Sequence, residues 1–251
     1  MSNGTTGQRI AVMRRGVAVL AVTILACGSD PAGSGDGALR ILFVGNSLTY
    51  ANDLPDMLHR LGTADGLTLE PSDVSQGGYA LEDHWATPAS RAALDEGGWD
   101  IVILQQGPSS LPASRENLVT WARTWADAIR ARGGTPALYM VWPERARLNV
   151  LDDVILSYRT AAEEADAELY AAGEAWKAAW NADPDLPLYG DDDFHPSVMG
   201  TYLAALTIYR GVTGRAPPSL GGLGISAEDD AILQAAAREA SAAAAARATT
   251  R

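Results

Sequence analysis

Short aliphatic runs alternate with longer segments of helical spacing, and this alternation constrains the fold of the chain more than any other feature. Strands that alternate with helices are typical of βαβ units, whose strands form one parallel sheet. We expect strands at residues 40–44, 67–74, 100–105, 136–141 and 167–171. We expect helices at residues 54–61, 88–94, 116–131, 151–165, 174–180 and 196–212, the last with Pro196 in its first turn. The pattern predicts an α/β fold.

A chain of 251 residues that is 47% hydrophobic can bury one sizeable core. We expect a single domain over residues 38–251, closing with a helix that begins near Ser226 and frays among alanines. The formal net charge is -12, and residues 1–26 hold three arginines and no acid, so the remainder carries -15. Such an acidic domain offers no surface to nucleic acid and is repelled by anionic lipid.

The N-terminal segment has the pattern of an export signal. Arg14 and Arg15 precede an apolar run over residues 17–26, which has the length of a signal sequence and is too short for a transmembrane helix. We expect residues 1–26 to be a signal peptide, and the arginine pair also fits a twin-arginine signal weakly. Residues 27–37 are rich in glycine and serine, which predicts a flexible tether.

The only cysteine, Cys27, ends this apolar run. The arrangement resembles a bacterial lipoprotein signal, in which the cysteine becomes the lipidated first residue of the mature protein, although Leu25 is bulkier than the usual residue. An ordinary cleaved signal is the alternative. We expect a cell-envelope lipoprotein or a secreted protein, with membrane contact only through the lipid anchor. Disulfides and cysteine metal sites are excluded from the domain.

A serine and an acid–imidazole pair lie near opposite ends of the domain. Ser47 follows the first expected strand, and Asp192 and His195 are three residues apart. A serine hydroxyl becomes a nucleophile when a base takes its proton and an anion orients that base. Because ligands of an open parallel sheet bind beyond the carboxyl ends of its strands, residues 45–47, 77–78 and 105–106 should meet at one edge.

The motifs Gly45-Asn46-Ser47-Leu48, Gly77-Gly78 and Asp192-x-x-His195 occur in this order, and the Gly-x-Ser-x-Gly turn of α/β-hydrolases is absent. Their order resembles the SGNH, or GDSL-like, hydrolases over residues 39–215. The resemblance implies a three-layer, flavodoxin-like, doubly wound sheet and an esterase, lipase or carbohydrate deacetylase. It also implies that Ser47 is the nucleophile, His195 the base and Asp192 the orienting acid.

Other roles remain open for these three residues. Ser47 can also cap the helix that follows it, and His195 can be a helix cap or a surface residue. Asp191 and Asp193 are the alternatives to Asp192, because the three acids are consecutive.

Ester hydrolysis also needs hydrogen-bond donors for the oxyanion. The first candidate is the backbone N–H of Ser47, and the second is Gly78, with Gly77 as the alternative. Most SGNH enzymes place an asparagine in a Gly-x-Asn-Asp block, where this chain has Gln105-Gln106-Gly107. The block resembles a branch with Gln-Gly-x-Ser that includes sugar O-acetylesterases. This implies a glutamine donor, Gln106 or alternatively Gln105, while a buried polar cap on the strand remains the other interpretation.

Four residues are candidates for the substrate pocket. They are Asn46, His84, Trp85 and Trp142, although a surface position for His84 and a core position for Trp142 are alternatives. The three histidines have no metal-ligand spacing, and no phosphate-binding glycine motif occurs, so we expect neither a metal nor a cofactor.

These patterns together predict an exported serine esterase that works through an acyl-enzyme. The preferred substrate is an acetylated carbohydrate, within a broader class of small-molecule or glycan esters. Lipase or lysophospholipase activity and acyl transfer are alternatives of the same fold. A noncatalytic lipoprotein that binds glycans is the alternative from another class.

Overall fold

The computed structural model describes residues 1, 4 and 37–249. The expected signal peptide over residues 1–26, the lipidation of Cys27 and the tether up to residue 36 lie outside the described residues and stay predictions. Within the described part of the chain, no helix combines the length and the apolar character needed to cross a membrane.

Five parallel strands form a single sheet, as predicted. The strands are β1 (Leu39–Val44), β2 (Leu69–Asp73), β3 (Ile101–Leu104), β4 (Thr135–Tyr139) and β5 (Glu168–Tyr170). Their order is β2-β1-β3-β4-β5, which is the flavodoxin-like order. All four residues of β3 and the last four of β1 are buried, as expected of central strands that are covered on both faces.

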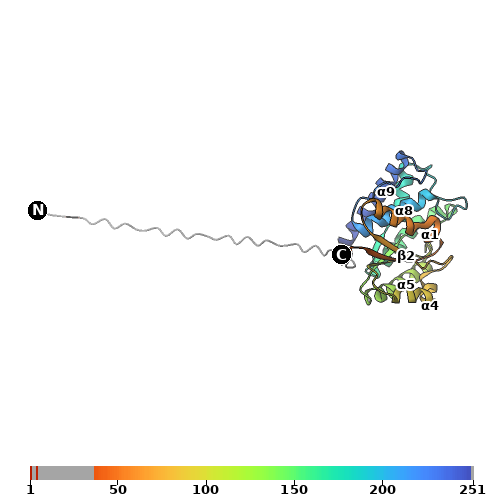
Figure 1. The fold of residues 1–251 in the computed structure, drawn as a ribbon, viewed down its shortest axis with the longest axis horizontal. Coiled ribbons are helices and arrows are strands. Elements are labelled where there is room, and N and C mark those ends of the chain that lie inside the picture. The colour runs from red at the N-terminus through yellow and green to blue at the C-terminus, as the bar shows by residue number, and fades with distance from the viewer. Residues whose placement is uncertain (2–3, 5–36, 250–251) are drawn as a thin grey trace. The chain divides into compact units, whose positions relative to one another are not determined.

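Helices cover both faces of the sheet and make three layers. On one face α2 packs against α8, and α8 packs against α9; on the other face α5 packs against α6 and α3. Figure 1 shows α8 and α9 on one side of β2, and α4 and α5 on the other. The longer helices are α2 (Leu54–Ala64), α4 (Pro88–Asp95), α5 (Pro112–Arg130), α6 (Leu151–Glu164), α7 (Ala172–Ala182), α8 (Val198–Thr213) and α9 (Ala227–Thr249). These seven are the helices that the sequence predicts.

Short helical segments were not predicted from the sequence. They are α1 (Ser47–Tyr50), η1 (Ala51–Asp53), α3 (Leu81–Ala86) and η2 (Arg145–Val150). None is longer than six residues, which is too short to show a helical repeat of apolar residues. They lie in the segments that follow β1, β2 and β4, at the edge where the candidate site was expected.

The start of α8 differs from the prediction. Pro196 does not lie in the first turn; it forms an isolated antiparallel bridge with Tyr189. Ser197 caps the helix instead, because its hydroxyl accepts a hydrogen bond from the Gly200 N–H at 3.1 Å. The bridge and the cap fix the chain immediately after His195. At the other end of the chain, α9 is helical as far as Thr249, beyond the point where the alanines were expected to fray.

Candidate active site

The turn that carries Ser47 is packed tightly at the end of β1. Asn46 caps α1, since its Oδ1 accepts a hydrogen bond from the Leu48 N–H at 3.1 Å, and Ser47 is the first residue of that helix. Gly45 leaves no room for a side chain: a Cβ there would lie 2.3 Å from Thr49 Oγ1 and 2.7 Å from Gln105 Oε1. Ser47 is half-buried and lies at the N-terminus of α1, where backbone N–H groups have no intrahelical acceptor.

Asp192 and His195 form a hydrogen-bonded pair, as their spacing suggested. The Oδ2 atom of Asp192 lies 2.5 Å from His195 Nδ1, and Oδ1 accepts hydrogen bonds from the backbone N–H groups of Phe194 and His195. The bond to the His195 side chain, followed by the two backbone bonds, lowers the pKa of Asp192 to about 2. An ionised carboxylate at Nδ1 keeps a hydrogen on that nitrogen, so Nε2 of the neutral ring is a proton acceptor.

The neighbouring aspartates have different surroundings. Asp193 is bound by Arg145, whose Nε lies 2.6 Å from Asp193 Oδ1 and whose backbone N–H donates to Asp193 O at 2.8 Å. Asp193 also has a positive φ of 57°, so this clamp holds a conformation that few side chains favour. Of the three consecutive aspartates, Asp192 is the one joined to the imidazole.

Trp142 is a core residue that supports the loop carrying His195, which corrects its assignment to the pocket wall. Its ring is completely buried and stacks on Trp176 with centroids 3.5 Å apart, so it has no surface for a substrate. Its Nε1–H donates to the carbonyl oxygen of Phe194 at 3.3 Å. The segment after β4 thus holds the residue that precedes His195.

Asn52 joins the segment after Ser47 to the segment after His195. Its Nδ2 donates to the Pro196 carbonyl oxygen at 2.8 Å and to Thr201 Oγ1 at 2.9 Å. Asn52 and Pro196 are 144 positions apart in the chain. The structure therefore brings the first and last motifs to one edge of the sheet.

The two candidate glutamines differ in how their amides are used. Gln105 is 1% exposed, and its Oε1 accepts hydrogen bonds from the Asn46 N–H and the Thr49 hydroxyl, both at 2.8 Å. Its Nε2 donates to Asn46 Oδ1 at 3.0 Å and to the Gln106 carbonyl at 2.7 Å. Both amide hydrogens of Gln105 are therefore used, one of them on the Ser47 turn and the other on the Gln106 carbonyl.

Gln106 keeps a donor. Its Oε1 accepts a hydrogen bond from the Leu81 N–H at 3.1 Å, and its Nε2 donates to Ser109 Oγ at 2.9 Å. An amide nitrogen carries two hydrogens, so one remains on Gln106 within the described network. The side-chain contacts thus separate two glutamines that the sequence left as alternatives.

The glycine loop is bonded to the Ser47 turn at two points. The Gln76 N–H donates to the Gly45 carbonyl, and Asn46 Nδ2 donates to the Tyr79 carbonyl, each at 3.0 Å. Gly78 lies between these anchors with φ +77°, and a Cβ added to it would meet no atom within 4 Å. A Cβ on Gly77 would lie 3.0 Å from the Tyr50 phenol oxygen, so Gly78 is the more open of the two glycines.

Asn46 and His84 are buried structural residues, which corrects their assignment to the pocket, whereas the assignment of the half-buried Trp85 stays a prediction. Asn46 is 6% exposed and bonded on both amide atoms. His84 is completely buried, neither on the surface nor lining an open pocket, and both of its ring nitrogens have partners. Trp85 packs edge-on against Trp125 and also near Trp121, on the α5 side. Asn46 and His84 thus hold the Ser47 turn through hydrogen bonds.

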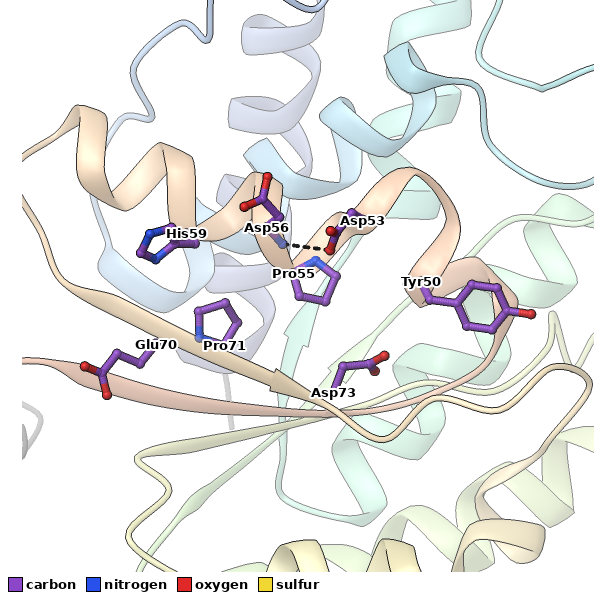
Figure 2. Close-up of a pocket in the computed structure, with 8 residues that line it drawn as sticks. All are labelled: Tyr50, Asp53, Pro55, Asp56, His59, Glu70, Pro71 and Asp73. Carbon is purple, nitrogen blue, oxygen red and sulfur yellow. Dashed lines mark hydrogen bonds between the residues drawn. The ribbon is translucent and has the colours of Figure 1, made fainter.

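A cavity of about 480 Å³ opens along the edge strand β2, next to the candidate site (Figure 2). Its lining residues are Tyr50, Asp53, Pro55, Asp56, His59, Glu70, Pro71 and Asp73. None of these is a predicted catalytic or oxyanion residue. Tyr50, the last residue of α1, lines one end of the cavity. From there the cavity extends along β2 and α2, away from Ser47.

Neither a protein-family model nor a curated protein matches this chain. Among solved structures, a protein assigned to the SGNH hydrolases from Slackia heliotrinireducens is 33% identical, with a TM-score of 0.59 over 70% of this chain and 99% of the other. A DUF4886 family protein from Bacteroides uniformis is 20% identical, with a TM-score of 0.71 over 81% and 94% of the two chains. A variant of Axe2, an acetyl-xylooligosaccharide esterase from Geobacillus, is 15% identical, with a TM-score of 0.57 over 76% and 100%.

Proposed function

Because this chain belongs to the SGNH hydrolase family, we propose that it is a serine esterase in which Ser47, His195 and Asp192 form the catalytic triad. The observation that carries the proposal is the bond between Asp192 and His195 Nδ1. It leaves Nε2 as the proton acceptor, on a loop that Asn52 ties to the segment after Ser47. The pair thus supplies what a serine lacks on its own, a base and an anion that orients it.

The reaction has two halves. The Ser47 oxygen attacks the ester carbonyl while its proton passes to His195 Nε2, and the same proton then goes to the departing alcohol as the ester C–O bond breaks. Water repeats the sequence on the acyl-enzyme and releases the acid and free Ser47. Asp192 stays ionised throughout because the His195 bond lowers its pKa, and the negative charge of its carboxylate favours the imidazolium that forms in each half.

The oxyanion of each tetrahedral intermediate needs donors that are already in place. We assign this role to the backbone N–H groups of Ser47 and Gly78 and to the remaining amide hydrogen of Gln106. Gln105 is the weaker choice, because both of its amide hydrogens are used in the structure. Its role is to fix Asn46, and through Asn46 the Ser47 turn.

The proposed substrate is an acetyl ester on a carbohydrate. The side chains of His195 and Asp192 are 38% and 55% exposed, so a bulky alcohol group can approach the triad without entering a deep channel. One structural neighbour is an acetyl-xylooligosaccharide esterase, and we propose the same class of substrate here. A small acyl group on a large polar alcohol fits such an open site.

The test uses the purified domain and its Ser47→Ala variant. We expect the wild type to react with a fluorophosphonate probe and to hydrolyse p-nitrophenyl acetate, and we expect the variant to do neither. An unreactive wild type, or an active variant, would overturn the triad. A second assay compares acetylated xylan oligosaccharides with octanoyl and palmitoyl esters, and a preference for the long chains would replace the substrate proposal by a lipase.

We also propose that the protein is exported and anchored by a lipid on Cys27. The proposal is supported by the apolar run before Cys27 and by the glycine-rich segment after it. Mass spectrometry of the protein from membranes should find a diacylglyceryl group at an N-terminal Cys27. An unmodified N-terminus downstream of Cys27 would indicate a secreted protein instead.

A further inference from the structure

His84 is a buried titratable residue that the proposed reaction does not use. It lies on α3 with no exposed surface, and its ring contacts the turn on which Ser47 sits. Its Nε2 lies 2.7 Å from the Gly45 carbonyl oxygen, and its Nδ1 lies 2.8 Å from Ser90 Oγ. Each of these distances is that of a good hydrogen bond.

The partners determine the tautomer of His84. A backbone carbonyl can only accept, so Nε2 must carry the hydrogen that is shared with Gly45. A neutral ring then has its lone pair on Nδ1, and the Ser90 hydroxyl donates to it. Burial lowers the pKa of His84 below its usual value, and this effect outweighs the opposing influence of the Gly45 bond and of the carboxylates of Asp83 and Asp73. The ring is therefore a neutral Nε2–H donor.

We infer that His84 is a positioning residue. By donating to the Gly45 carbonyl from α3, the helix that follows the glycine loop, it fixes the positions of the two backbone oxyanion donors relative to each other. The inference rests on the proposed function, in which those donors are the N–H groups of Ser47 and Gly78. Gly45 is two residues before Ser47, and α3 begins three residues after Gly78. The ring thus connects the segments that carry both donors.

Two other contacts make this connection specific. The Gly45 carbonyl also accepts the Gln76 N–H at 3.0 Å, so one oxygen is fixed from the glycine loop and from α3. The ring of Tyr79, the residue after Gly78, packs edge-on against the His84 ring, with centroids 5.1 Å apart, so His84 contacts the glycine loop as well. Without His84, Gly45 keeps one hydrogen bond, so the expected consequence is a shifted turn and not an orphaned carbonyl.

The kinetic test compares His84→Leu with His84→Gln, whose amide nitrogen reaches the position of Nε2. We expect His84→Leu to lower kcat on p-nitrophenyl acetate by about 10–100-fold with KM within about twofold, since displaced donors act on the transition state. We expect His84→Gln to stay within about threefold of wild type, because a donor to Gly45 remains. His59→Gln, on an exposed histidine of α2, is the matched control and should not change kcat.

A folded His84→Leu that keeps wild-type kcat, or a loss that falls on KM alone, would overturn the inference. If His84→Leu does not fold, His84→Asn decides: its shorter amide can keep the Ser90 contact but does not reach the Gly45 carbonyl, so kcat should fall several-fold with KM unchanged, and wild-type kcat would reject the role. In the folded wild type, imidazole ¹⁵N shifts should show neutral Nε2–H at His84 near neutral pH; an Nδ1–H or doubly protonated ring contradicts it. An inactive wild type, or an active Ser47→Ala, instead removes the proposed function and leaves the tautomer result standing.

Discussion

Asp192 holds His195 with both of its carboxylate oxygens, one on the backbone N–H at 2.8 Å and one on Nδ1 at 2.5 Å. The two bonds fix the ring as well as its tautomer, because they join the same carboxylate to two parts of one residue. The pair is formed within a single short turn, so it does not depend on the approach of a distant element. This local origin explains why the spacing Asp-x-x-His is visible in the sequence.

Replacing Asp192 by Asn should reduce catalysis while leaving the fold intact. An amide can donate to Nδ1, which favours the hydrogen on Nε2 and removes the base, so kcat on p-nitrophenyl acetate should fall by roughly 10²–10⁴-fold. Asp191→Asn is the matched control, because it makes the same change of charge one residue earlier, away from the bond that joins Asp192 to His195. Equal losses in the two variants would remove Asp192 from the triad.

Replacing each glutamine should have a different main effect, on activity for Gln106 and on stability for Gln105. Gln106→Met removes the remaining amide donor and should lower kcat by roughly 10²–10³-fold. Gln105→Met leaves the buried Asn46 N–H and Thr49 hydroxyl without this acceptor, so the free energy of unfolding should fall by about 2–4 kcal/mol. Urea unfolding and steady-state kinetics of both proteins check this, and the reverse assignment of the two effects would show that Gln105 is the oxyanion donor.

His84 should make the protein less stable in mild acid. Burial lowers the pKa of His84 in the folded state, so the unfolded chain binds this proton more readily and stability rises with pH. The contribution is lost as pH falls below about 6.5, the ordinary histidine value of the unfolded chain. Between neutral pH and mild acid the Tm of the wild type should therefore fall more than that of His84→Gln, and parallel curves in scanning calorimetry would contradict the assignment.

The central strands could be predicted from the sequence because they are buried on both faces. Runs such as Ile101–Leu104 are continuously aliphatic, and a central parallel strand requires this. The short helices around the site could not be predicted, since Ser47–Tyr50 is a single turn that depends on the Asn46 cap. The sequence predicts Pro196 in the first turn of a helix, which suits proline, but Pro196 forms a bridge with Tyr189 instead.

The residues of the candidate site divide in the same way. Ser47, Asp192 and His195 lie in short local motifs, whereas the positions of His84 and Trp142 depend on partners that are 39 and 52 residues away. The sequence suggests the pocket for both because His84 follows the glycine block and Trp142 ends the fourth expected strand. Both side chains are instead buried, with hydrogen bonds to the Gly45 and Phe194 carbonyls. No pattern along the chain indicates such partners.

Gly45→Ala should damage both the fold and the reaction, because the tight turn has no space for a methyl group. The new Cβ would lie 2.3 Å from Thr49 Oγ1 and 2.7 Å from Gln105 Oε1, two atoms that are joined by a hydrogen bond. Overpacking of this kind should lower the free energy of unfolding by about 1–3 kcal/mol. Displacing Ser47 by about 1 Å should lower kcat by about 10²-fold.

Gly221→Ala, at a position with no atom within 4 Å of the new Cβ, is the control that should match the wild type in urea unfolding and in turnover. If Gly45→Ala also matches the wild type, the turn is not held as tightly as the contacts of Thr49 and Gln105 require.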